Sequence, residues 1–162
     1  MTVHDDGSPD TIVGKIQSPP RIRQLFEDWD ERKRGNPFPG WDTFDPIDLK
    51  YILGNLVLLD VEPGAPYKSR YRVYGSKVTA QRGCDLTGRY VDDVPPADRR
   101  AFLNDNYSMI AESGSPLHAI RYVRQDGRKF HHEILSLPLA SDDRTVDKIL
   151  VAVVPIDRSI WL

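Results

Sequence analysis

Histidine is the residue type in this 162-residue chain best suited to metal or proton-transfer chemistry, and three histidines fall close together, at His118, His131 and His132. The last two are adjacent in a segment that alternates as a β-strand does, so their side chains point to opposite faces of a sheet. At most one of them can join His118, and only Glu133 offers a nearby carboxylate ligand. We therefore predict no metal site.

The single cysteine, Cys84, lies in the stretch RGCDLTG, residues 82–88. One cysteine excludes an internal disulfide and a multi-cysteine metal site. The neighbouring Asp85 does not favour the reactive thiolate, and Arg82 favours it only weakly. We expect Cys84 to be partly buried and unreactive.

Catalytic patterns are missing from the sequence. Adjacent acids occur at residues 92–93 and 142–143, in turn-like segments where carboxylates are usually solvated or cap helices. The sequence has none of the patterns of serine hydrolases, P-loop nucleotidases, zinc proteases or dinucleotide-binding proteins. We predict no catalytic residues and a protein that is not an enzyme. The less favoured alternative is an enzyme that uses His132 or Glu133.

The composition describes one globular domain. Forty per cent of the residues are hydrophobic, which is enough for a sizeable core in a chain of this length. Twenty-two Lys and Arg against 24 Asp and Glu give a net charge of -2, which argues against a nucleic-acid binder. The apolar runs are far shorter than the roughly 20 residues of a membrane-spanning helix, and the acidic N-terminal residues do not form a signal peptide. We expect a cytoplasmic protein that binds neither nucleic acid nor membranes.

The spacing of apolar residues predicts helices and strands in an α+β arrangement. Ile22, Leu25, Phe26 and Trp29 recur at helical spacing after two prolines, and this helix should stop near Gly35. The other expected elements are a short helix over 45–53, strands over 56–61 and from residue 70, a loop-rich stretch over 76–96, a helix over 97–112, and strands over 116–124, 128–139 and 146–156. The expected organisation is a flexible tail over 1–18, a flanking helix and linker over 19–44, the main domain over 45–157 and a short tail over 158–162.

Several short motifs accompany this element order. They are Asp45-Pro46 with Leu49, Gly54-Asn55-Leu56, Tyr71-Arg72-Val73 with Gly75, the stretch GCDLTG at 83–88, and Leu135 with Leu137-Pro138-Leu139. With these motifs the chain, over about residues 22–156, resembles the PAS sensory domains, and in particular short PAS-family proteins found mainly in alphaproteobacteria. The resemblance implies a five-stranded antiparallel sheet of order 2-1-5-4-3, with helices crossing one face and an N-terminal flanking helix.

The resemblance also implies a regulatory module. Many PAS domains hold a small molecule between the sheet and the crossing helices, or use the other sheet face to form dimers or bind a signalling protein. The flavin-binding branch carries a reactive cysteine in a different stretch, and the helix over 97–112 lacks the axial histidine common in haem-binding members. We therefore disfavour flavin and haem, and the sequence predicts no other cofactor.

Candidate ligand-binding residues are those that strand alternation and the resemblance place around such a cavity. They are Tyr71, Val73, Tyr90, Tyr107, Ile120, Tyr122 and His132. Tyrosine suits a pocket because it supplies an apolar wall and a hydroxyl group. Arg72 and Arg121 alternate with this apolar set and could clamp a carboxylate or phosphate. Only one set can face the cavity, and we expect the apolar set there, with Arg72 near an edge.

The apolar stripe of the first helix has two alternative roles. Leu25, Phe26 and Trp29 either pair with a second copy of the chain or pack against the chain's own sheet, and we assign them to the dimer contact. The chain ends a few residues after the last strand, so we expect the signal to pass to a separate protein. The predicted function is a freestanding sensory or adaptor module that binds a small ligand, a signalling protein or both, as a homodimer. The alternative is a ligand-free structural interaction domain.

Overall fold

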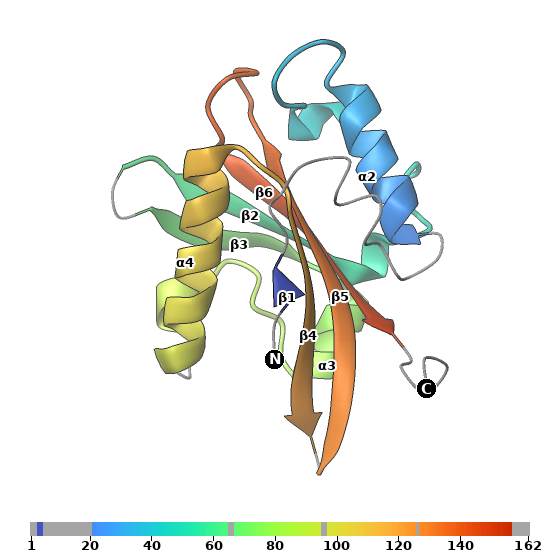
Figure 1. The fold of residues 1–162 in the computed structure, drawn as a ribbon, viewed down its shortest axis with the longest axis vertical. Coiled ribbons are helices and arrows are strands. Elements are labelled where there is room, and N and C mark those ends of the chain that lie inside the picture. The colour runs from blue at the N-terminus through green and yellow to red at the C-terminus, as the bar shows by residue number, and fades with distance from the viewer. Residues whose placement is uncertain (1–2, 5–20, 65–66, 95–96, 126, 157–162) are drawn as a thin grey trace.

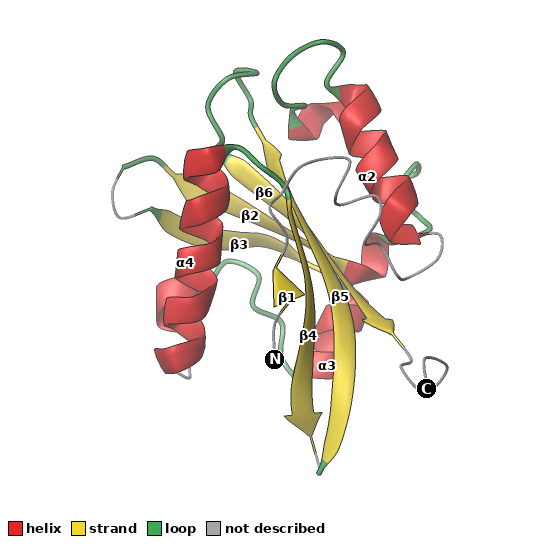
Figure 2. Ribbon diagram, viewed as in Figure 1, coloured by secondary structure: helices red, strands yellow, loops and turns green. Residues whose placement is uncertain are grey.

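The protein is built on one antiparallel sheet (Figures 1 and 2). The computed structural model describes residues 3–4, 21–64, 67–94, 97–125 and 127–156. Within these residues the strands are β1 (Val3–His4), β2 (Leu56–Glu62), β3 (Lys68–Tyr74), β4 (Leu117–Gln125), β5 (Arg128–Leu139) and β6 (Lys148–Ile156). They lie in the order β1-β4-β5-β6-β2-β3, and every neighbouring pair is antiparallel.

The five long strands confirm the order expected from the sequence, because numbering them along the chain gives 2-1-5-4-3. The sixth strand corrects the prediction that residues 1–18 form only a flexible tail. Val3 pairs with Ile120 and His4 pairs with Ala119, so this short strand covers the free edge of β4. Pairing at an edge satisfies backbone groups that the open edge would leave exposed. The rest of the predicted tail and the segment 158–162 lie outside the described residues.

Helices lie against the sheet on both sides. The α-helices are α2 (Arg21–Arg32), α3 (Ser76–Arg82) and α4 (Ala97–Ser113), and the 3₁₀-helices are η1 (Trp41–Thr43), η2 (Leu53–Asn55) and η3 (Val91–Asp93). In Figure 1, α2 and α4 lie far apart at the two sides of the molecule. Residues 76–94 of the expected loop-rich stretch form α3, η3 and connecting turns, and residues 95–96 lie outside the described residues.

Two hydrophobic cores divide the molecule, one on each face of the sheet. Alternate residues of one strand enter different cores: Leu58 packs with α2, and its neighbours Val57 and Leu59 pack with α3 and α4. This division follows from the strand period of two residues. We call the side covered by α2 the α2 face and the side covered by α3 and α4 the α4 face.

The stripe of α2 is buried within its own chain, which corrects its assignment to a dimer contact. Leu25, Phe26 and Trp29 are at most 4% exposed and pack with leucines of β2, β5 and β6. The Trp29 indole Nε1 also donates a hydrogen bond of 2.9 Å to the Pro138 carbonyl oxygen. These side chains cannot reach a second copy without opening the core. The alternative role, packing on the chain's own sheet, is the one observed.

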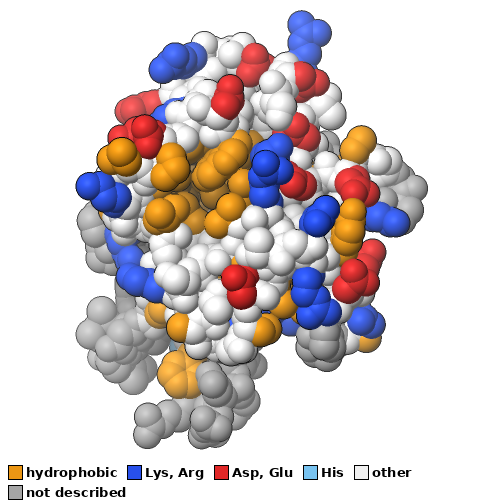
Figure 3. Space-filling model, turned by 180° about the vertical axis from the view of Figure 1, so that it is seen from behind, with side chains coloured by type: hydrophobic (Ala, Val, Ile, Leu, Met, Phe, Trp, Pro, Cys, Tyr) orange, Lys and Arg blue, Asp and Glu red, His pale blue; other side chains and the backbone are white. Residues whose placement is uncertain are grey.

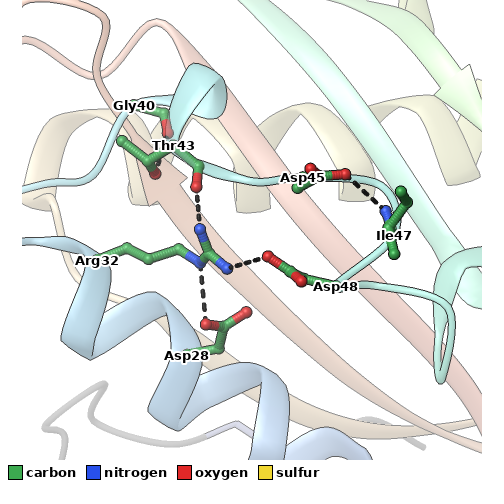
Figure 4. Close-up of polar contacts among 7 residues, drawn as sticks. All are labelled: Asp28, Arg32, Gly40, Thr43, Asp45, Ile47 and Asp48. Atoms are coloured by element: carbon green, nitrogen blue, oxygen red, sulfur yellow. Dashed lines mark hydrogen bonds and ion pairs between the residues drawn. The ribbon is translucent and has the colours of Figure 1, made fainter.

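The segment after α2 is held by one arginine (Figure 4). Arg32 donates from Nε to Asp28 Oδ1 at 2.9 Å, from one terminal nitrogen to the Thr43 carbonyl oxygen and from the other to Asp48 Oδ2 at 3.3 Å. The guanidinium also stands 4.8 Å from the centre of the Phe44 ring. The planar fork of arginine allows these contacts at once, so one side chain ties α2 to residues 43–48.

The short helix expected over 45–53 is not a regular helix. Its backbone N–H groups bond three residues back, as Asp48 does to Asp45 and Ile52 does to Leu49, and the stretch forms consecutive turns before η2. Ile47 in this stretch is 67% exposed. The Asp45 side chain bonds the backbone of Ile47, a local contact that favours turns.

Two motif glycines allow a close backbone approach at the start of α3. The Gly75 N–H donates a hydrogen bond of 2.8 Å to the Leu56 carbonyl oxygen, which fixes the end of β3 to the start of β2. A Cβ on Gly75 would lie 2.4 Å from the Gly54 carbonyl oxygen. No larger residue fits without moving backbone, so this glycine sets where the crossing segment leaves the sheet.

Candidate functional site

A cavity of about 120 Å³ lies on the α4 face, between the sheet and helices α3 and α4. Its walls combine aliphatic, aromatic and cationic side chains. They are Val57, Tyr71, Tyr74, Val78, Gln81, Arg82, Arg99, Leu103, Tyr107, Arg121, His132, Ile134, Ser136, Val151 and Val153. Gln81 is exposed and Arg82 is half-buried, so the cavity reaches the surface at the end of α3. Concave sites with mostly apolar walls and a few polar groups are the usual form of small-molecule sites.

Three tyrosines form the aromatic part of the wall. Tyr71 and Tyr74 pack edge to face with ring centres 5.4 Å apart, and Tyr107 reaches the cavity from α4. A bulge brings the two strand tyrosines together, because Leu58 pairs with Val73 while Leu59 pairs with Tyr71. Burial raises the pKa of the Tyr71 and Tyr107 hydroxyls, so both are neutral donors and acceptors at physiological pH.

Three arginines reach the cavity from three different elements: Arg82 from α3, Arg99 from α4 and Arg121 from β4. The Arg82 Nε donates to the Tyr74 hydroxyl at 3.2 Å. Arg121 lies against the Phe102 ring, 4.5 Å from its centre. Burial lowers the pKa of Arg99 and Arg121, and repulsion from Arg82 lowers that of Arg99 further. The site is therefore electropositive, and none of its lining residues is Asp or Glu.

His132 adds a titratable group beside the arginines. It pairs directly with Arg121 across β4 and β5 and lines the cavity. Burial lowers the pKa of His132, and repulsion from His131 and Arg99 lowers it further. The imidazole is thus held in its neutral form, which can both accept and donate a hydrogen bond.

Comparison with known protein families shows which family this chain belongs to. The model for the PAS domain matches residues 17–154, most of the chain. The chain belongs to the PAS domain family. The PAS domain is generally a sensory module and not an enzyme. The narrower resemblance to short alphaproteobacterial members stays a prediction, and no curated protein matches this chain.

Solved structures similar to this PAS domain include further PAS and LOV domains. The PAS domain of the histidine kinase ThkA is 14% identical, with coverage of 62% of this chain and 96% of that chain and a TM-score of 0.45. The blue-light photoreceptor Aureochrome1 LOV in its dark structure is 16% identical over 72% of this chain and 86% of that chain, with a TM-score of 0.48. A variant of RsLOV is 16% identical, with a TM-score of 0.44, over 64% of this chain, which spans only 61% of that one. Likeness at this identity concerns the fold alone.

The PAS cavity brings together three of the seven side chains predicted to bind a ligand. Tyr71, Tyr107 and His132 line it. Whether they contact a ligand stays a prediction. Tyr122 pairs with His131 through the backbone of β4 and β5, but its side chain lies outside the described residues.

Val73 and Tyr90 lie outside the cavity, contrary to their predicted place. The bulge in β3 turns Val73 away from the tyrosines and leaves it 38% exposed. The Tyr90 hydroxyl instead donates a hydrogen bond of 2.7 Å to Glu62 Oε1 at the surface, and its ring lies 5.6 Å from the Arg70 guanidinium. Strict alternation along β3 therefore gave the wrong face for Val73.

The predicted choice between Ile120 and Arg121 was also wrong. Arg121 lines the cavity, and Ile120 is buried without being among the lining residues. Leu117 and Ala119 belong to the α4-face core, and Arg121 shares their place in the alternation of β4. Arg72, by contrast, is exposed on the edge strand β3, as expected, where it bonds Asp60 at 3.2 Å.

The buried acid of the enzyme alternative, Glu133, lies away from the cavity. Glu133 follows His132 in β5 and so turns to the other face, where its Oε1 is 3.7 Å from His118 Nε2. Of the two residues named for the enzyme alternative, only His132 lines the cavity, and Glu133 does not. Within the described ranges, no three His, Cys, Asp or Glu side chains come together in a metal-binding group.

The flavin and haem groups known from other PAS domains do not fit this site. Its volume of about 120 Å³ is below the roughly 300–1,000 Å³ of drug-sized ligand pockets. Cys84 is exposed and is not a lining residue, which also corrects the expectation that it is partly buried. The described part of α4 offers no histidine to bind an iron atom.

Polar lining residues that were not among the predicted ligand-binding residues include Tyr74, Arg82, Arg99 and Ser136. Tyr74 was hidden by the bulge, and Ser136 carries no pattern of its own in a leucine-rich strand. Arg82 and Arg99 lie in helical segments rich in charge, where a solvated cation is the ordinary interpretation. One pattern in the sequence could have found Arg121: it alternates in step with Leu117 and Ala119, so the three side chains share one face of the strand.

The surface seen from behind carries a gathering of hydrophobic side chains (Figure 3). Large apolar residues with substantial exposure include Ile47 at 67%, Leu53 at 39% and Val73 at 38%. None of the helices among the described residues is long and apolar enough to cross a bilayer. Exposed apolar groups of this kind are common at protein interaction surfaces.

Proposed function

We propose that this PAS domain is a sensory module of the cytoplasm that binds a small molecule in its α4-face cavity and passes the signal to a separate protein. The observation that carries the proposal is the shared wall of the cavity. Val57, Val151 and Val153 come from the central strands, whereas Arg82 and Leu103 come from α3 and α4. A ligand there contacts the sheet and the crossing helices at once.

This shared wall gives a physical route for signalling. A ligand that prefers one placement of α3 and α4 stabilises that placement and shifts the population toward it. The shift is limited by the difference in ligand affinity between the two placements: a tenfold preference supplies about 1.4 kcal/mol. The mixed apolar and cationic lining is suited to binding a small molecule and fixing its orientation. The proposed role is therefore a ligand sensor and not an enzyme.

Native mass spectrometry of the protein purified from its own host tests the proposal. We expect a retained small molecule whose mass is lost when Leu103 is replaced by Trp, since the larger ring fills the cavity. The exposed substitution Glu112→Trp on the same helix is the matched control and should leave the ligand bound. Repeated absence of any retained mass from the native protein, with no metabolite altering its thermal denaturation, would contradict a ligand-sensing role.

A second candidate function is a ligand-free interaction domain, and the exposed apolar residues favour it. Ile47 lies in a run of turns that packs on α2, Leu53 begins η2 directly after it, and Val73 lies on the edge strand β3. This function predicts that Ile47→Asp weakens capture of a signalling protein or of a second copy while the cavity stays empty. Sedimentation velocity of the native chain and of Ile47→Asp measures the self-association that we propose. Unchanged monomers in both samples would exclude a homodimer through this surface.

A further inference from the structure

The lining of the α4-face cavity points to one chemical class of ligand. We propose that the cavity binds a small organic carboxylate with a compact apolar body, held by Arg82, Arg99 and Arg121. The inference rests on the proposed function and adds what the ligand is. The first observation is the composition of the cavity wall: three guanidinium groups share one cavity whose fifteen lining residues include no carboxylate.

Arg121 is the group that most needs an anion. Its Nε is buried and makes no hydrogen bond within the described part of the chain. One face of its guanidinium is covered by the Phe102 ring at 4.5 Å, which leaves its edge for a planar partner. Buried polar groups are nearly always hydrogen-bonded, and a carboxylate matches the fork of an arginine with two parallel bonds.

The three cations affect one another. Repulsion by Arg82 lowers the pKa of Arg99, and repulsion by Arg99 lowers the pKa of Arg121, in addition to the effect of burial on each. Clustered like charges in a partly dry site destabilise the empty protein. A bound anion removes that repulsion, so the cluster is an arrangement that favours a negative ligand over a neutral one of the same shape.

The rest of the wall defines the body of the ligand. Leu103, Val57, Val151 and Val153 are apolar. Burial raises the pKa of the Tyr107 hydroxyl, and Arg121 and Arg99 lie close enough to oppose that rise. A volume of about 120 Å³ is close to the roughly 150 Å³ of an engineered cavity that binds benzene. One small ring or short branched chain therefore fits, with its carboxylate toward the arginines.

Isothermal titration calorimetry of the full chain with matched probes tests this inference. Benzoate, phenylacetate and acetate are compared with benzamide and with inorganic phosphate at constant ionic strength. We expect at least one aromatic carboxylate to bind tenfold or more tightly than benzamide, and more tightly than phosphate or acetate, which lack the apolar body. Equal binding of the acid and the amide, or of the acid and phosphate, would overturn the inference.

The variant Arg121→Met keeps the length of the side chain and removes its charge. We expect it to bind the carboxylate at least tenfold more weakly, while the melting temperature of the ligand-free protein stays equal or rises, because a half-buried cation repelled by Arg99 is gone. The control Arg72→Met removes an exposed strand arginine outside the cavity and should leave binding unchanged. If Arg121→Met fails to fold, Arg82→Met at the half-buried mouth provides the same comparison, with an expected loss of threefold or more.

The outcomes separate this inference from the proposed function. A neutral molecule retained by the native protein, or equal binding of benzoate and benzamide, overturns the carboxylate assignment and leaves the ligand sensor standing. Binding that Arg121→Met and Arg82→Met both leave unchanged also overturns it. Failure of every probe together with no retained mass overturns both.

Discussion

The two faces of the sheet are built from the same strands but differ in how completely they are filled. On the α2 face, leucines of β2, β5 and β6 close around Trp29, and the one polar group of that side chain is bonded to the Pro138 carbonyl. On the α4 face, three arginines and three tyrosines surround open space. Adjacent residues such as Leu135 and Ser136 therefore meet different environments.

This difference indicates that the two faces of one sheet serve different purposes. A closed, apolar face supplies the free energy that holds the fold, since burying each large side chain contributes about 1.5–3 kcal/mol. A cavity with clustered cations costs stability, so it is interpreted as serving a use other than folding. The α2 face is therefore interpreted as the structural half of the molecule, and the α4 face as the receptive half.

The largest expected effect is on the structural half. Trp29→Ala should lower the free energy of unfolding by about 3–5 kcal/mol, because it leaves a large cavity and removes the hydrogen bond to Pro138. Urea denaturation measures the loss. The exposed substitution Gln24→Ala on the same helix should change stability by less than about 0.5 kcal/mol. A small loss for Trp29→Ala would mean that the α2 face is loosely packed.

Enlarging one residue on each face compares their packing directly. Ala152→Leu places extra atoms in the fully buried α2-face core and should cost about 1–3 kcal/mol. Ser136→Leu projects toward the cavity and should cost less by at least about 1 kcal/mol, because space is available there. Equal losses in urea denaturation would contradict the difference in filling.

Removal of the arginine that ties α2 to the following turns should have a moderate effect. Arg32→Ala loses bonds to Asp28, the Thr43 carbonyl and Asp48, and we expect a loss of about 1–2 kcal/mol. Thermal denaturation beside the exposed Glu31→Ala variant measures it. A variant as stable as the native protein would mean that these bonds only replace bonds to water.

The smallest expected effect concerns pH and the receptive half. The pKa of His132 is lowered in the folded protein, so below the unfolded value of about 6.5 the unfolded chain binds more protons. Stability should therefore fall as the pH drops below 6.5, and His132→Gln should reduce that fall. Urea midpoints at pH 5.5 and 7.5 measure the difference between the native protein and the variant. Identical pH dependence would show that His132 is not held neutral.

Much of the fold could be predicted from local patterns. The helix around Trp29, the hairpin of β4 and β5, and the five-strand order follow from apolar spacing, turn residues and the motifs of the resemblance. The turns over 45–53 could not, because Asp45 and Pro46 begin a helix and a run of turns equally well. Pairing of Val3 and His4 with β4 depends on contacts distant in sequence, which no local pattern reveals.

The site was predicted less well because it depends on features that two-residue alternation ignores. One extra residue in β3 moved Tyr74 into the cavity and Val73 out of it. A cation was expected outside, yet Arg121 lies inside, since hydrophobicity alone cannot identify a face whose cavity is lined by arginines. Arg82 and Arg99 meet Arg121 only after α3 and α4 are folded over the sheet.

Methyl NMR during a titration with sodium benzoate tests the central claim, that one face is closed and the other receptive. Neighbouring residues on opposite faces form matched pairs: Val57 with Leu58, Ile134 with Leu135, and Val151 with Leu150. The account predicts that the methyl signals of Val57, Ile134 and Val151 shift with benzoate while those of their leucine neighbours stay in place. Equal shifts within the pairs, or shifts confined to the leucines, would contradict it.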